Sequence, residues 1–247
     1  MRMLFFIALL ALGTCHPLSP SGNYVFLGAS DGNGTGTTVP CTYNDVHCIG
    51  GKAWPVQLVV HEPSLTLYDY GVVPFEGNGF TDGVRAEVDQ MPANAQYITL
   101  GTFNELIRDA LTGVPVATAV ANYRSGVYDI IAAARKKAPG ARVVFYNSPN
   151  WAAMGFMASQ PQAVRELLQA IVNAVDVQVL NPLEKLTNAT ILDLRCDPNT
   201  YNPANLDAGG PHPNDAGAAN LATLVLSGFS GPLPTPLADC PQAHLVP

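Results

Sequence analysis

Short apolar runs alternate with longer amphipathic stretches over most of this chain. The apolar runs are continuous and rich in β-branched and aromatic residues, which is typical of strands buried on both faces of a parallel sheet. They predict strands at Tyr24–Gly28, Leu65–Tyr70, Gln96–Leu100, Arg142–Tyr146 and Thr190–Leu194. The amphipathic stretches predict helices at Lys52–His61, Asp82–Gln90, Thr118–Lys137, Pro161–Val175 and Asn214–Leu226.

The order of these elements predicts the fold. Strand and helix alternate five times along the chain, which indicates an α/β fold, a three-layer α/β/α sandwich around a five-stranded, mostly parallel doubly wound sheet. We expect one domain over residues 21–247, with an irregular surface tail from about Gly231. Ligands of such a sheet bind outside the carboxyl ends of its strands, so the residues that follow each strand are the candidates for chemistry.

The first residues indicate export. Arg2 precedes an apolar run from Leu4 to Leu12, and the small residues Gly13 and Thr14 follow it. This run is too short to cross a bilayer, which takes roughly 20 residues, but it suits the core of a secretory signal peptide. We expect residues 1–20 to be that signal peptide and the protein to be secreted or held in the cell envelope. A buried N-terminal helix or strand is the alternative.

The cysteines fit an oxidising compartment. Cys15 ends a segment that approximates a bacterial lipoprotein cleavage box, so we expect membrane attachment only if Cys15 is lipidated. The other four cysteines predict two disulfides, with three possible pairings. Cys41 and Cys48 are close enough to close one loop, and Cys196 with Cys240 would fasten the C-terminal tail.

Composition excludes some functions. The chain has 12 Lys+Arg against 19 Asp+Glu, and its only basic cluster is Arg135–Lys137, so we expect no nucleic-acid surface. No two cysteines have the CxxC spacing of a metal–thiolate site. The glycosylation sequons at Asn33 and Asn188 matter only if the source is eukaryotic. The oligomeric state stays open.

Three polar residues stand out after the predicted strands. Ser30 lies between glycines in the turn after the first strand, where its hydroxyl can project from the sheet edge. Asn104 follows the third strand, and His212 stands between two prolines just before the last helix. Each has a plainer interpretation when taken alone, as a capping serine, a helix N-cap and a surface histidine.

Taken in order, these segments resemble the SGNH (GDSL-type) hydrolases. Gly28-Ala29-Ser30 is similar to the family's Gly-Asp-Ser block, Thr102–Glu105 to its Gly-x-Asn-Asp block, and Gly209–Pro213 to its Asp-x-x-His-Pro block. Ala141–Asn150 resembles its fourth strand and the exit from it. The resemblance spans about residues 23 to 228 and implies a flavodoxin-like sheet and the hydrolysis of carboxylic esters.

The resemblance also implies a mechanism. Ser30 would form an acyl-enzyme, with His212 as its general base and no metal or organic cofactor. The oxyanion would be held by the Ser30 backbone N–H, the Asn104 side chain and a glycine N–H after the second strand. The family's glycine block is blurred there, since Pro74 stands at the expected glycine and has no N–H. We therefore favour Gly77 as the donor, with Gly71 and Gly79 as alternatives.

The acid that would orient His212 is displaced. Gly209 stands where the family has its acid, three residues before the histidine. Asp207 is the favoured replacement, Asp197 is the second candidate, and a histidine held by a backbone carbonyl is the third possibility.

The sequence leaves the ester open among small-molecule, lipid and glycan esters. A non-catalytic secreted ligand-binding relative is the alternative function. An α/β-hydrolase is a further alternative, but that fold needs a Gly-x-Ser-x-Gly pentapeptide in mid-chain.

Overall fold

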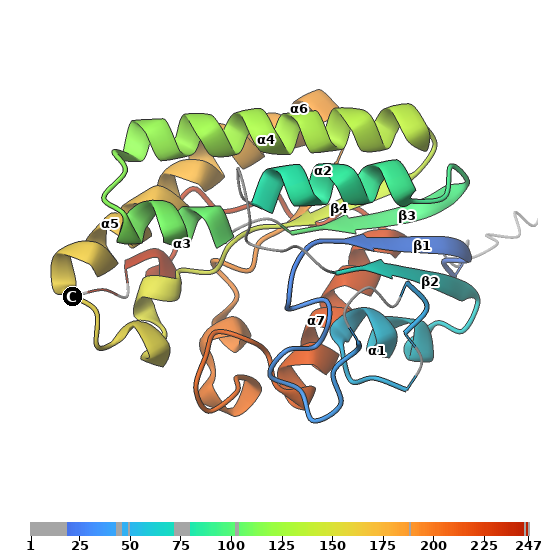
Figure 1. The fold of residues 1–247 in the computed structure, drawn as a ribbon, viewed down its shortest axis with the longest axis horizontal. Helices are drawn as coiled ribbons and strands as arrows, with labels where there is room; N and C mark the ends of the chain where they lie inside the picture. Colours follow the sequence, from blue (N-terminus) through green and yellow to red (C-terminus); the bar gives the residue numbers. More distant parts are fainter. Residues whose placement is uncertain are drawn as a thin grey trace, which may run out of the picture.

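Five parallel strands form the centre of the molecule, in the order β2-β1-β3-β4-β5 (Figure 1). A computed structural model of the chain describes residues 19–42, 46–48, 50–71, 80–101, 104–187, 189–244 and 246. The strands are β1 (Gly22–Leu27), β2 (Leu65–Tyr70), β3 (Ala95–Leu100), β4 (Arg142–Tyr146) and β5 (Thr190–Leu192). Every pairing between neighbouring strands is parallel, which confirms the predicted α/β fold with a doubly wound sheet.

Helices cover both faces of this sheet, so the molecule has three layers (Figure 1). Helices α1 (Trp54–His61) and α7 (Asp215–Ser230) lie together on one face. The other face carries α2 (Phe80–Gln90), α3 (Asn104–Leu111), α4 (Val116–Lys137), α5 (Gln162–Val175) and α6 (Asn181–Thr187). The core lies between these layers, and the side chains of Tyr24–Leu27 in β1 and Val144–Tyr146 in β4 are fully buried in it.

The sequence did not predict α3 and α6. Both are short, at 8 and 7 residues, and α6 continues a π-helical segment, Asp176–Leu180, that extends α5. The predicted end of the last strand at Leu194 was also wrong, because β5 stops at Leu192. The backbone N–H groups of Leu194 and Arg195 donate instead to the Asn147 side-chain oxygen, at 2.6 and 3.1 Å. The Asn147 side chain thus takes the place of the backbone hydrogen bonds that would continue the strand.

Two disulfides join the four cysteines that the sequence singled out. Cys41 bonds to Cys48, and Cys196 bonds to Cys240. The second bond fastens the tail beyond Gly231, which is irregular as expected but is packed onto the domain, since Ala243 and Val246 are buried. Within the described residues, no helix is both long and apolar enough to span a membrane.

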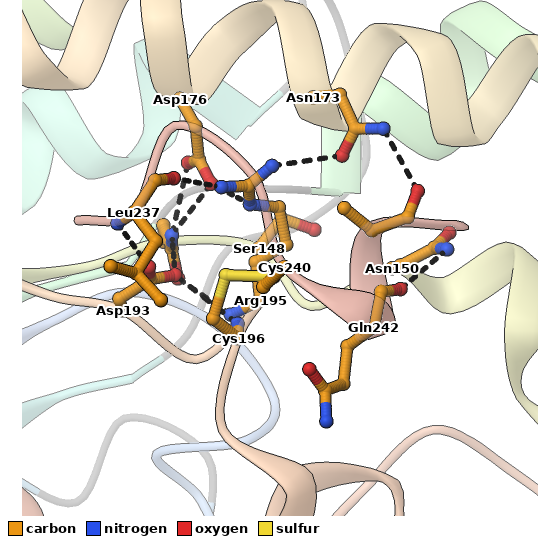
Figure 2. A network of polar contacts seen from close by, with 12 residues as sticks. Ser148, Asn150, Asn173, Asp176, Asp193, Arg195, Cys196, Leu237, Cys240 and Gln242 are labelled. Carbon is orange, nitrogen blue, oxygen red and sulfur yellow. Dashed lines mark hydrogen bonds and ion pairs between the residues drawn. A yellow bond between two sulfur atoms is a disulfide. The ribbon is translucent and has the colours of Figure 1, made fainter. Parts of the chain in front are cut away.

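A buried polar network also holds the tail (Figure 2). The Arg195 guanidinium forms an ion pair with Asp176 and donates to the Leu237 carbonyl and to the Asn173 side chain. Asp193 accepts the Leu237 backbone N–H at 3.0 Å. Burial raises the pKa of Asp176 to about 7, although the charge of Arg195 acts to lower it.

The two sequons have different outcomes. Asn33 is only 3% exposed, and its amide donates to the Gly71 carbonyl, so the folded protein does not present it for glycosylation. Asn188 and the predicted signal peptide up to residue 18 lie outside the described residues.

Candidate active site

Ser30 lies at the carboxyl edge of the sheet, in the turn that follows β1. The turn is closed by hydrogen bonds from Gly32 N–H to the Ala29 carbonyl and from Thr35 N–H to the Ser30 carbonyl, each 3.0 Å long. Glu87 of α2 supports its start, because its carboxylate accepts the Gly28 N–H. Among the described residues, the Ser30 backbone N–H has no acceptor, so it is free to bind a ligand oxygen.

His212 is carried by a loop that is folded back on itself just before α7. Leu206 and Pro213 form an antiparallel bridge, and the Asp207 N–H donates to the His212 carbonyl at 3.0 Å. Asn214 ends the loop, because its side-chain oxygen accepts the first free N–H groups of α7 and its amide donates to two loop carbonyls.

The fold brings the predicted nucleophile and base together. The Nε2 atom of His212 lies 2.9 Å from the Ser30 Oγ, although the two residues are 182 positions apart. This is a hydrogen-bond distance, and it is the arrangement that a serine nucleophile and its general base require.

The carboxylate of Asp207 lies beside the imidazole of His212 without a hydrogen bond to it. A Cβ atom added at Gly210 would be 3.1 Å from the Asp207 Oδ1 and 3.5 Å from the His212 Nδ1, so both groups border the same residue. The Oδ1 atom is buried and has no hydrogen-bond partner among the described residues. An unpaired buried carboxylate oxygen is costly, so this group is poised to accept a proton donor.

Asp197, the second candidate acid, is engaged elsewhere. It caps the 3₁₀ turn Pro198–Tyr201, where one of its oxygens accepts from Asn199 and the other accepts from Thr200. Of the two candidates, the structure therefore places Asp207 next to the imidazole.

The structure tests the predicted oxyanion donors only in part. Gly71 has its N–H committed to the Asp69 carboxylate at 2.8 Å, so it is not free to hold an oxyanion. Gly77, Gly79 and Pro74 lie outside the described residues. Asn104 is the first residue of α3 and follows the carboxyl end of β3. The structure describes its backbone but not its side chain.

A second carboxyl, which belongs to none of the predicted site residues, lies next to the nucleophile in the chain. Asp31 is buried and accepts a 2.6 Å hydrogen bond from the Tyr146 hydroxyl. Burial raises the pKa of Asp31, against the lowering effects of the Tyr146 hydrogen bond and of the His212 charge. The Tyr146 ring reaches this position because it packs directly on Gly101, where a side chain would collide with it. The place of Asp31 directly after Ser30 was the only signal in the sequence.

A cleft of about 660 Å³, including the part open to solvent, opens beside Ser30 and His212. Its walls come from the exit of β4, the loop before α7 and the first turns of α7. Within the described ranges, no cluster of three or more His, Cys, Asp or Glu side chains is placed to hold a metal ion.

Comparisons with known proteins give a fold but no sequence relative. No protein-family model matches the chain, and no curated protein matches it significantly. An extracellular lipase from Streptomyces rimosus matches 85% of this chain with 100% of its own, at a TM-score of 0.61 and 16% identity. A phospholipase A1 from Streptomyces albidoflavus matches 86% of this chain with 100% of its own, at a TM-score of 0.57 and 14% sequence identity.

A protein described as a GDSL-like lipase, from Parabacteroides merdae, matches 86% of this chain with 97% of its own, at a TM-score of 0.52 and 14% identity. These identities are low, but the likeness extends over nearly the whole of each partner and includes the parallel sheet with helices on both faces. The chain therefore has the fold of the SGNH (GDSL-type) lipases and esterases, as its sequence blocks predicted.

Proposed function

We propose that this protein is a carboxylic ester hydrolase that works through an acyl-enzyme on Ser30. The observation that carries the proposal is the 2.9 Å contact between the Ser30 Oγ and the His212 Nε2 at the carboxyl edge of the sheet. The fold supports it, because structures with this fold include a lipase and a phospholipase A1.

The residues divide the chemistry between them. The Ser30 Oγ attacks the ester carbonyl carbon while His212 Nε2 takes its proton, and the alcohol leaves with that proton. Water then attacks the acyl-enzyme by the same route and regenerates Ser30. The free Ser30 N–H would hold the oxyanion, with Asn104 and Gly77 as the proposed further donors. This sequence of steps needs no metal and no organic cofactor.

Asp207 is the proposed orienting acid. His212 acts as a base through Nε2 only if the proton of the neutral ring sits on Nδ1, and a carboxylate at Nδ1 favours that tautomer. The unpaired Oδ1 of Asp207 borders the same residue as Nδ1 and is the acceptor that this role requires.

A serine-reactive organophosphonate and chromogenic p-nitrophenyl esters test the proposal. We expect the probe to label Ser30, and we expect Ser30→Ala to abolish both labelling and turnover. Ser230→Ala is the matched control, because Ser230 is exposed at the end of α7 and does not line the cleft. Labelling of another serine, or full turnover by Ser30→Ala, would overturn the assignment.

One observation favours the alternative of a non-catalytic ligand-binding relative. Gly209 replaces the family's acid, and the Asp207 carboxylate makes no hydrogen bond to the His212 imidazole. In that case the wild-type protein would bind esters without turning them over, and the same assay would show it.

We also propose that the protein is exported. The two disulfides and the apolar run near Met1 support this, because such bonds persist in oxidising compartments. Mass spectrometry of protein from its native host should find that the first 13 to 20 residues have been removed. A diacylglyceryl mass on Cys15 would show an envelope-anchored form, and a retained Met1 would contradict export.

A further inference from the structure

The cleft beside the catalytic pair is mainly apolar. Trp151, Leu194 and Leu221 line it as buried side chains, and Leu206 and Leu224 line it as half-buried ones. Ser30 and His212 border the same cleft, so a substrate group that is bonded directly to the reacting carbonyl or to its alcohol oxygen can enter it.

Three polar side chains in the wall already donate hydrogen bonds to neighbouring groups. The amide of Asn199 and the hydroxyl of Thr200 both donate to Asp197, at 3.2 Å, and the amide of Asn205 donates to the Asn199 carbonyl at 2.9 Å. A sugar site needs several free, convergent hydrogen-bonding groups, but among the described side chains of this wall away from the catalytic pair only the Asn220 amide has no partner.

We propose that this cleft receives an unbranched hydrocarbon chain of the ester, so that the protein prefers esters with chains of several carbons to acetyl esters and to esters of acetylated glycans. The inference rests on the proposed ester hydrolysis and names its substrate class. An apolar wall gains binding energy from each methylene that it removes from water.

The wild-type protein gives the first test, with p-nitrophenyl acetate, butanoate, hexanoate and octanoate as substrates. Hexanoate has four more methylenes than acetate, and burial of each corresponds to about a fourfold gain, so we expect kcat/KM to rise roughly 250-fold from acetate to hexanoate. A flat or falling acyl series with clear acetate turnover, together with no gain in the alcohol series described next, would overturn this inference and leave the proposed function standing. Turnover of none of the esters would overturn both.

A parallel series locates the chain in the acyl or the alcohol half of the ester. Hexyl acetate against ethyl acetate changes only the alcohol half, whereas hexanoate against acetate changes only the acyl half. A gain in either series supports the hydrocarbon site and shows which half enters the cleft, and a gain in neither overturns it.

Asn220 offers a way to fill the cleft. It lines the cleft from α7, is half-buried and has no hydrogen-bond partner among the described residues. We expect Asn220→Trp to lower the hexanoate-to-acetate ratio of kcat/KM at least tenfold. The matched control is Thr223→Trp on the same helix, because Thr223 is exposed and lies outside the cleft lining, and we expect it to leave that ratio unchanged.

A second variant keeps the test decisive if Asn220→Trp does not fold. Leu224→Ala widens the cleft from the same helix, and we expect it to move the preferred substrate toward longer chains. An unchanged chain-length profile in both Asn220→Trp and Leu224→Ala would show that the chain binds elsewhere and would overturn the proposal.

Discussion

The imidazole of His212 must carry its proton on Nδ1 if Nε2 is to accept the proton of Ser30. Asp207 lies beside Nδ1 with an unpaired oxygen, and Asp197 is held in its own turn. Because the oxygens of Asp197 already accept hydrogen bonds and one oxygen of Asp207 does not, Asp207 is the better candidate for the acid that orients His212.

We predict that Asp207→Asn lowers kcat by up to roughly 10⁴-fold while the protein stays folded, because an amide at this position favours the wrong histidine tautomer. Steady-state kinetics on a p-nitrophenyl ester, with circular dichroism as a check of folding, measures the effect. Asp197→Asn is the matched control and should be nearly neutral for kcat. Near-normal kcat in Asp207→Asn, or the large loss in Asp197→Asn, would contradict the assignment.

Asp176, whose carboxyl is buried, is a second single residue with a measurable consequence. Its pKa is raised from 3.8 to about 7 by burial, while Arg195 opposes the shift and Asp193 adds to it. Between these two values the folded protein binds a proton that the unfolded chain has released. The contribution of this proton to stability is thus complete below about pH 4 and is lost as the pH rises through about 7.

We predict that the free energy of unfolding of the wild type falls between pH 4 and pH 7, with an upper bound of roughly 4 kcal/mol for this residue. Asp176→Asn should lack this component, since its side chain does not titrate. Denaturant unfolding across pH 4 to 8 measures both proteins. Asp129→Asn, a change at an exposed carboxylate on α4, should keep the wild-type slope, and the prediction fails if Asp176→Asn keeps it too.

At the scale of the elements, two turns from opposite ends of the chain meet at the active site. The turn after β1 brings Ser30, and the loop before α7 brings His212. Gly36 lies where they touch, with φ at +93°, and a Cβ atom there would be 2.8 Å from the Cβ of His212. The fit of the two turns therefore depends on the absence of a side chain at this position.

We predict that Gly36→Ala lowers kcat roughly 10- to 100-fold, because a displacement of His212 away from Ser30 misaligns the reacting groups. Gly50→Ala is the matched control. Gly50 has a similar φ of +82° with nothing within 4 Å, so both variants should lose about 1–2 kcal/mol of stability but only Gly36→Ala should lose activity. Equal activity in the two variants would show that the contact has no catalytic consequence.

At the scale of the whole molecule, the tail is part of the catalytic domain. The disulfide between Cys196 and Cys240 spans 44 positions and joins the tail to the segment after β5, which continues into the loop that carries His212. The buried ion pair of Arg195 with Asp176 and the contacts of Leu237 act at the same place (Figure 2). The disulfide of Cys41 with Cys48 spans only 7 positions.

We predict that the two disulfides differ in their effect on stability. The loop-closure relation gives about 4 kcal/mol for the Cys196–Cys240 bond and about 2.4 kcal/mol for the Cys41–Cys48 bond. Replacement of each pair by alanine, followed by denaturant unfolding, tests the order. A loss from the shorter loop that equals or exceeds the other would contradict the predicted order.

Local patterns were enough to predict most of the architecture. Five strands and five of the helices could be predicted because the hydrophobic period and the end residues of each lie within one short segment. The alternation of these strands and helices along the chain then predicted the parallel sheet. Ser30 and His212 could be singled out for the same reason, because the glycines and prolines that present them are their sequence neighbours. The helices α3 and α6 were missed because a helix of about two turns shows too little of its period.

Tertiary structure decided what depends on distant partners. The contact between Ser30 and His212 joins residues 182 positions apart, and the hydrogen bond of Tyr146 to Asp31 joins residues 115 apart. Three other features also depend on distant partners. They are the unpaired oxygen of Asp207, the hydrogen bond to Asn147 just beyond the end of β5, and the packing of the tail. A sequence determines its elements through nearest neighbours, but the partners of a polar side chain are set by the chain that folds against it.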